Sequence, residues 1–381
     1  MEYLLNSNEI AIYIHIPFCK RRCLYCDYVS TTNTKLKDIY FEALKKELTL
    51  RSNELKDKKV KTVYLGGGTP SYVELYYIED IFHILKDNYN LSELEEFTIE
   101  VNPESINEFK LRTYKSMGIN RISVGFQSTS DNILKNVGRL HTFEEGVKAY
   151  NLISSFFENV NIDFILGLPG ENKNTVEKTL EYIGKLKPPH ISYYLFDPSH
   201  ETPLKNLCEN GKMHLPDSDL LSDLLDFIYQ KLEKIGYNRY EISSWSQDNK
   251  ESLHNEFYWK NLNYIGFGLS AGGHLNRFRY VNTCDIEVYV QALTSDNFAY
   301  EFTYNNNEYQ ELTETLFMGL RLLEGVNYES LLDRFEKTIS DEFINKILKN
   351  LQGYITYEDG VIKLTKKGLD FSRYVFEELI S

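Results

Sequence analysis

The chain has 381 residues, which is enough for one large α/β domain and a smaller second domain. It is 42% hydrophobic and 26% charged, as soluble globular proteins are, and its sequence contains no run of eighteen apolar residues that could span a membrane. The formal net charge of −14 disfavours binding to nucleic acid, because a protein that binds the phosphate backbone needs a basic surface.

The first ten residues, MEYLLNSNEI, are acidic and lack the basic and apolar regions of a signal peptide. Three of the five cysteines are clustered, which fits a reducing compartment better than a disulfide scaffold. We therefore expect a cytoplasmic protein whose contact with a membrane is at most peripheral. The sequence does not determine the oligomeric state, and a homodimer is kept as a hypothesis.

Short β-rich runs alternate with helical patterns through the first half of the chain. Apolar residues at i, i+3 and i+4 predict helices over 39–48, 77–85 and 106–118. Such strand–helix repeats imply parallel strands joined by right-handed crossovers, either as a partial barrel or as an open sheet. Both arrangements place a ligand outside the carboxyl ends of the strands. The six expected strands are 10–16, 61–65, 97–101, 121–126, 160–166 and 190–196.

A break with two prolines, 197–203, ends the predicted repeats. A long amphipathic helix is expected at 218–235, before a segment rich in aromatic residues and glycine. From about residue 308 the pattern is helix–helix–strand–strand–helix, with a hairpin formed by 354–357 and 361–364. This pattern resembles a winged helix, which we interpret as a lid or partner-docking module because the chain is acidic. The expected domains are 1–200, 201–305 and 306–381.

Cys19, Cys23 and Cys26 form a CxxxCxxC motif directly after the first predicted strand. Three thiolates can bind three irons of a [4Fe–4S] cluster and leave the fourth iron open to a small molecule, whereas electron-transfer clusters use four cysteines. The alternatives are a zinc site, which prefers four ligands, and three unrelated thiols. No second CxxC motif occurs, so the spacing favours the cluster.

The basic run 20–22 lies between two of these cysteines. It is either a solvated charge run, or its positive charge offsets the anionic cluster or attracts an acidic partner or a propionate group.

Glycine and polar residues recur where the predicted strands end. The run GGGTP at 66–70 either lets the backbone approach a ligand closely or forms only a tight turn. Glu100, Gln127 and Asp163 are expected at strand ends, where a carboxylate can bind an amine or a ribose diol. Arg139 follows a short helix and can pair with a carboxylate. Any one of these residues alone is more often a surface residue, and their repeated placement indicates a site.

The motifs YIHIPFC, GGGTP, IEVNPE and GLPG occur in an order and spacing that resembles the radical S-adenosylmethionine superfamily. Within it, the chain from about residue 10 onward is similar to oxygen-independent coproporphyrinogen III oxidases and their relatives. The resemblance implies an α/β fold, a partial (β/α)6 barrel followed by a smaller C-terminal α+β, winged-helix-like region. It also implies a [4Fe–4S] cluster whose open iron binds the methionyl amine and carboxylate of S-adenosylmethionine.

Through this resemblance, roles are implied for individual residues. Arg139 would pair with the carboxylate of S-adenosylmethionine, and Tyr13 would lie near the cluster. For Tyr13 and Gln127 the alternative of simple packing stays open. The implied cluster ligands are Cys19, Cys23 and Cys26. The implied contacts to the methionine end are Gly67, Gly68 and Thr69, and those to the rest of the cofactor are Glu100, Gln127 and Asp163.

Two departures separate the chain from the oxidases and match the heme chaperone subfamily, HemW. The oxidases carry a fourth cysteine two residues after the third cluster ligand, where this chain has Tyr28, and a long N-terminal arm, where only twelve residues precede Tyr13. HNEFYW at 254–259 resembles the HNxxYW signature of that subfamily, which implies that His254 binds heme. The alternative is a structural His-Asn turn that packs two aromatic residues. Weaker candidates for heme binding are His141, His200 and His274.

The sequence therefore favours a heme chaperone that binds heme, a [4Fe–4S] cluster and S-adenosylmethionine and delivers heme to acceptor hemoproteins. The alternative is an oxygen-independent coproporphyrinogen III oxidase, in which a 5′-deoxyadenosyl radical starts the oxidative decarboxylation to protoporphyrinogen IX. Radical methylation or heme ring opening is a third class. Whether the protein is an enzyme stays open, and we expect that it lacks coproporphyrinogen oxidase activity.

Overall fold

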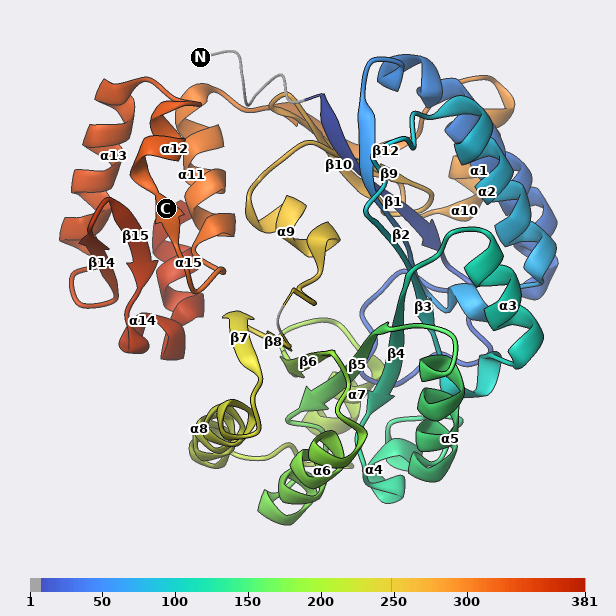
Figure 1. Ribbon diagram of the computed structural model, residues 1–381, viewed down its shortest axis with the longest axis horizontal. Coiled ribbons are helices and arrows are strands. Elements are labelled where there is room, and N and C mark those ends of the chain that lie inside the picture. Colours follow the sequence, from blue (N-terminus) through green and yellow to red (C-terminus); the bar gives the residue numbers. More distant parts are fainter. Residues whose placement is uncertain (1–7, 248, 381) are drawn as a thin grey trace.

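The computed structural model describes residues 8–247 and 249–380, and its main body is one twelve-stranded, curved sheet with helices on its outer face (Figure 1). Six parallel strands form the centre of the sheet in chain order, as the sequence predicts. These strands are β1 (Glu9–Ile16), β2 (Lys59–Gly67), β3 (Glu96–Val101), β4 (Arg121–Gln127), β5 (Asn159–Leu166) and β6 (His190–Leu195).

The connecting helices explain why the central strands read as nearly continuous apolar runs. They cover the outer face of the sheet, so strands such as β4 are buried on both faces. Side-chain caps set several helix starts: Thr142, for example, accepts from the backbone of Glu145 and forms a capping box at α5. The helices are α1 (Lys37–Arg51), α2 (Leu75–Asn88), α3 (Glu108–Ser116), α4 (Asp131–Asn136), α5 (Phe143–Ser154) and α6 (Lys173–Leu186).

The segment after β6 extends the same sheet at both edges, which the sequence pattern did not predict. At one edge β8 (Ser244–Ser246) pairs with β6, and β7 (Asn238–Glu241) follows it. At the other edge β9 (Tyr264–Phe267) runs parallel to β1 and is followed by antiparallel strands. These are β10 (Gly272–Leu275), β11 (Phe278–Asn282) and β12 (Tyr300–Asn305). Where the chain divides into domains stays a prediction.

Four helices belong to this segment. The amphipathic helix expected at 218–235 is α8 (Ser218–Lys234), and α9 (Leu253–Trp259) lies inside the curve of the sheet (Figure 1). The other two are α7 (Pro203–Glu209) and α10 (Ile286–Thr294). Because α9 carries the HNEFYW motif, this motif lies in the interior of the fold.

The C-terminal region has its own apolar core and a three-stranded antiparallel sheet, ordered β13-β15-β14. The predicted hairpin is present as β14 (Ile355–Glu358) and β15 (Val361–Leu364). The remaining elements are α11 (Glu308–Gly319), β13 (Val326–Asn327), α12 (Tyr328–Leu332), α13 (Lys337–Asn350), α14 (Lys366–Asp370) and α15 (Ser372–Ile380). None of the described helices is long and apolar enough to cross a membrane.

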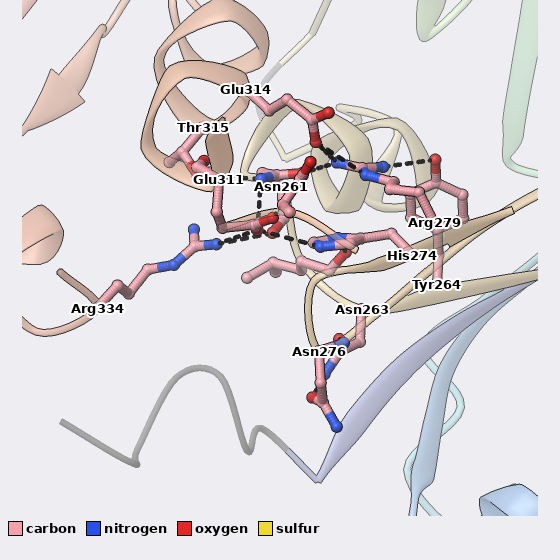
Figure 2. A network of polar contacts seen from close by, with 12 residues as sticks. Asn261, Asn263, Tyr264, His274, Asn276, Arg279, Glu311, Glu314, Thr315 and Arg334 are labelled. Atoms are coloured by element: carbon pink, nitrogen blue, oxygen red, sulfur yellow. Dashed lines mark hydrogen bonds and ion pairs between the residues drawn. The ribbon is translucent and has the colours of Figure 1, made fainter. Parts of the chain in front are cut away.

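A buried polar network joins this C-terminal region to the extended sheet (Figure 2). Glu311 of α11 accepts a hydrogen bond from Asn261 at 2.9 Å and lies 3.1 Å from His274 Nε2. Arg334 donates to the carbonyl oxygen of Asn261 at 3.0 Å. Burial acts to raise the pKa of Glu311, but hydrogen bonds from His274 and Asn306 lower it to about 2. The ionised carboxylate therefore anchors the C-terminal region in one orientation.

Candidate functional site

One cavity of about 380 Å³ lies where the parallel strands reach their carboxyl ends, next to the loop 17–33 that carries the clustered cysteines. It brings together every residue that the sequence analysis assigned to the cluster or to S-adenosylmethionine except Tyr13. The predicted residues that line it are Cys19, Cys23, Cys26, Gly67, Gly68, Thr69, Glu100, Gln127, Arg139 and Asp163.

The three clustered thiols are free of disulfides and face this cavity. Thr69 Oγ1 donates to Cys19 Sγ at 3.5 Å, and Arg139 Nη1 donates to Cys23 Sγ at 3.8 Å. Such donors stabilise sulfur that carries negative charge, as it does when it ligates iron. Burial raises the pKa of the Cys26 thiol to about 12, so the thiolate form there needs a bound cation.

These cysteines suit a cluster rather than one ion. Among residues 8–247 and 249–380, no three His, Cys, Asp or Glu side chains converge on a position for a single metal ion. A cube does not require such convergence, because each thiolate binds a different iron. The thiols and their donors therefore fit a [4Fe–4S] cluster held by Cys19, Cys23 and Cys26.

Arg139 is fixed beside the cysteine loop in a position to bind a carboxylate. Its Nη2 donates to Asn102 Oδ1 at 2.8 Å and to the carbonyl oxygen of Gly125 at 2.6 Å, while Nη1 points toward Cys23. Its Nε is buried and has no partner among the described residues. A buried N–H donor without an acceptor lowers the stability of the fold, and a bound ligand that supplies an acceptor removes this cost. The position of Arg139 therefore fits an anionic group bound next to the cluster.

The turn after β2 approaches the cavity through backbone that only glycine allows. Gly67 has φ +109°, and a Cβ there would lie about 2.5 Å from the ring of His15. Its N–H donates to Glu100 Oε2 at 3.1 Å, and the hydroxyl of Tyr64 donates to Oε1 at 2.8 Å. Burial raises the pKa of Glu100 to about 7. This carboxyl group is thus held as an acceptor that changes charge near neutral pH.

Asp163 and Gln127 reach the cavity from neighbouring strands. Asp163 lies in the middle of β5 and not at its end, which corrects the prediction, because β5 continues beyond it to Leu166. Ser123 and Asn161 donate to its two carboxylate oxygens at 2.8 and 2.7 Å. Gln127 ends β4 with φ +67°, after an irregularity in the register of β4 and β5.

Tyr13 lies beside the site without lining the cavity. Its hydroxyl is 3.0 Å from His15 Nδ1, and His15 Nε2 donates to the carbonyl oxygen of Val29 at 2.8 Å. Nδ1 therefore accepts from Tyr13. The pair connects β1 to the cysteine loop, and whether Tyr13 also contacts a cofactor stays a prediction.

His254 does not line the cavity and lies behind Tyr64, which does, inside the barrel. It is 1% exposed, with Nδ1 2.7 Å from Thr62 Oγ1 and Nε2 2.8 Å from the hydroxyl of Tyr258. Burial lowers its pKa to about 3, and its ring stacks on Tyr64. Both ring nitrogens are hydrogen-bonded to side chains of the protein, so this geometry matches the structural His-Asn turn that the sequence analysis kept as the alternative. Heme binding by His254 stays a prediction.

Sequence reasoning missed several residues of the cavity wall. Asn102, which orients Arg139, lies in the IEVNPE motif and could have been found there. Asp27 and Tyr28 directly follow Cys26, and their position beside a cluster ligand was the available signal. Tyr194 comes from β6, and no local pattern marks it. His200, in the loop after β6, was named in the sequence analysis only as a weaker candidate for heme binding.

Comparison with known proteins agrees with this geometry. The family model of the radical SAM superfamily matches residues 13–183, and that of the HemN C-terminal domain matches residues 308–371. Heme chaperone HemW of Lactococcus lactis is 32% identical over 374 residues, which are 97% of this chain and 96% of that protein. Heme chaperone HemW of Bacillus subtilis is 30% identical over 372 residues, 96% of this chain and 97% of that protein.

The fold also matches a solved structure. Coproporphyrinogen III oxidase (HemN) from Escherichia coli, described as a radical SAM enzyme, aligns with a TM-score of 0.85 over 98% of this chain and 90% of that chain. Its sequence identity of 22% supports a shared fold alone. From the superfamily match and the relatives that align along its whole length, the chain belongs to the radical SAM superfamily and, within it, to the HemW family.

Proposed function

We propose that this protein is a heme chaperone that binds heme, a [4Fe–4S] cluster and S-adenosylmethionine, and delivers heme to acceptor hemoproteins. The observation that carries the proposal is the similarity over the whole chain to relatives that are named heme chaperone HemW. The cavity at Cys19, Cys23 and Cys26 supports the cofactor part of the proposal, because thiols and their hydrogen-bond donors are assembled there with a buried arginine, Arg139.

The residues of the cavity have distinct tasks in this proposal. When bound, the cluster supplies a redox-active iron with one position open to an amine and a carboxylate. Arg139 orients the carboxylate of S-adenosylmethionine, while Gly67 and Gly68 let the backbone approach its methionine end. Glu100 and Asp163 accept hydrogen bonds from the polar groups of the cofactor, because neighbouring donors hold both carboxyl groups in fixed orientations.

We also propose where and in what form the protein acts. It receives heme in the cytoplasm, passes it to acceptor hemoproteins by direct contact, and forms a homodimer. The clustered free thiols support a reducing compartment. The oligomeric state is measured by light scattering on the cluster-loaded protein, and a strictly monomeric mass contradicts the dimer.

One experiment tests the function. The protein is reconstituted anaerobically with iron and sulfide, loaded with heme, and mixed with apomyoglobin, while a parallel reaction with coproporphyrinogen III is assayed for protoporphyrinogen. We expect saturable heme binding, transfer of heme to the apoprotein and no protoporphyrinogen. Turnover to protoporphyrinogen, or an intact cluster without saturable heme binding, would refute the proposal.

A further inference from the structure

We infer that heme docks at the mouth of the cofactor cavity, with its iron facing His200. This inference rests on the proposed function and names the site for its cargo. Of the eight histidines in the sequence, all of which the structure describes, His200 is the one that lines this cavity.

The side chain of His200 is oriented in the way that metal-binding histidines are. It belongs to the loop between β6 and α7, is 52% exposed, and donates from Nδ1 to the carboxylate of Asp27. A carboxylate on one ring nitrogen fixes the tautomer and leaves the lone pair of the other nitrogen for a metal. The nearest acidic oxygen to Nε2 is Asp197 Oδ2 at 3.8 Å, beyond hydrogen-bond distance. Nε2 is therefore available to an iron that approaches from solvent.

This arrangement contrasts with that of His254. The imidazole of His254 is enclosed, and both of its nitrogens are already bonded to hydroxyl groups of Thr62 and Tyr258. Binding iron there would require the loss of one of these hydrogen bonds and the opening of the barrel interior. Binding at His200 requires neither.

Three exposed aromatic and apolar side chains line the same cavity as His200. Tyr28 is 64% exposed, and Tyr194 and Leu195 at the end of β6 are also exposed, although all three are large hydrophobic residues that line the same cavity. Grouped exposed apolar side chains of this kind indicate a binding surface. An aromatic ring offers the face that a planar porphyrin packs against.

The charges at the mouth also suit heme. Arg21 and Arg22 are exposed and line the cavity on the side of the cysteine loop, where guanidinium groups can pair with the two propionates. Asp27 and Asp197 lie next to His200, where their negative charge favours a ferric iron. Arg373 of α15 lies 3.8 Å from Asp197 and partly offsets that carboxylate.

The site shares residues with the cluster loop, since Asp27 and Tyr28 directly follow the cluster ligand Cys26. Order in that loop is thus required both for the cluster and for the orientation of His200. This arrangement places the heme surface directly over the cofactor cavity.

Hemin titration of the cluster-loaded full chain tests the inference, with the Soret band and the EPR spectrum of ferric heme as readouts. His200→Ala is compared with His83→Ala, which removes an exposed imidazole from α2, away from the cavity. We expect His200→Ala to weaken binding at least about tenfold and to lose the histidine-ligated spectrum. Asp27→Asn should weaken binding less, and free imidazole should restore the spectrum of His200→Ala.

Each contrary outcome has its own meaning. If His200→Ala and His83→Ala both bind hemin as the unchanged protein does, the inference is wrong although the proposed function stands. If His254→Gln stays folded by circular dichroism but loses the histidine-ligated spectrum, His254 is the ligand and the inference is again wrong. If the unchanged protein shows no saturable hemin binding, both the function and the inference fail.

Discussion

The hydrogen bonds of His254 predict that this residue stabilises the fold. The substitution His254→Ala removes a fully enclosed imidazole and leaves the hydroxyl groups of Thr62 and Tyr258 without their partner. Truncation of a large buried side chain costs about 2–5 kcal/mol, and each buried hydroxyl left unpaired costs about 1 kcal/mol more. Since partial relaxation recovers some of this, we expect the free energy of unfolding to fall by about 4 kcal/mol.

Urea unfolding followed by circular dichroism measures this loss. His83→Ala is the control, because the side chain of His83 is exposed and its removal should change the free energy of unfolding by no more than about 0.5 kcal/mol. The reasoning is wrong if His254→Ala lowers the free energy of unfolding by less than about 1 kcal/mol, since this buried imidazole is hydrogen-bonded to the buried hydroxyl of Thr62 and to the hydroxyl of Tyr258.

The same residue gives a pH dependence of known sign. Burial lowers the pKa of His254 from 6.5 to about 3, so the folded protein keeps the ring neutral while the unfolded chain protonates it below pH 6.5. The stability that the neutral ring contributes is therefore present above pH 6.5 and is lost as the pH falls toward 3. Between pH 7 and 5.5 this residue accounts for about 1.3 kcal/mol, which should be absent from the pH dependence of His254→Gln. Equal pH dependence of the two proteins would contradict the assignment.

Three further predictions concern the cofactor site and the contact between the C-terminal region and the sheet. Arg139→Lys should weaken S-adenosylmethionine binding by about tenfold in anaerobic calorimetry, because a lysine cannot pair with a carboxylate through two donors; unchanged affinity refutes this role. Glu100 has its pKa raised by burial to about 7, so the stability it contributes is present below pH 4.5 and is lost as the pH rises through 7. Glu100→Gln should remove that decrease in the free energy of unfolding, which is about 2 kcal/mol between pH 5 and 8 once solvent screening is allowed for. If the variant shows the same pH dependence of unfolding as the unchanged protein, the raised pKa of Glu100 is contradicted. Glu311→Ala should cost about 3–5 kcal/mol and speed hydrogen exchange in residues 308–380, because Arg334 and His274 lose their carboxylate; exchange as slow as in the unchanged protein contradicts an anchoring role.

The cavity could be predicted from the sequence because its residues obey local rules. Parallel strands end at one edge of the sheet, so Cys19, Gly67 and Glu100 meet there although they come from separate strands. Arg139 belongs to the same group because the chain returns past the cysteine loop after β4. Strand order explains why these residues lie together, whereas their roles toward a cofactor stay predictions from the family resemblance.

The edges of the sheet could not be predicted in this way. β8 has three residues, SWS, which are too few to show the apolar run or the alternation that marks a strand. β12, YEFTYN, does alternate aromatic and polar residues, but its place at the edge of this sheet comes from its pairing with β11. β9 pairs with β1, and what selects this pairing is the packing of residues far apart in the chain.

The surroundings of the histidines depend on the tertiary fold in the same way. Thr62 and His254 are 192 residues apart in the sequence, and Asp27 and His200 are 173 apart. A motif such as HNEFYW therefore gives no sign of which imidazole is enclosed and which is exposed. Only the folded chain distinguishes the packed His254 from His200 at the cavity mouth.

The EPR spectrum of the anaerobically reconstituted and reduced protein, recorded before and after addition of S-adenosylmethionine, tests the central claim most directly. A cube held by Cys19, Cys23 and Cys26 should contain about four irons and four sulfides per chain, and its signal should change when the cofactor occupies the open iron. A signal that stays the same at saturating cofactor, or a preparation that retains zinc in place of iron and sulfide, would contradict the account.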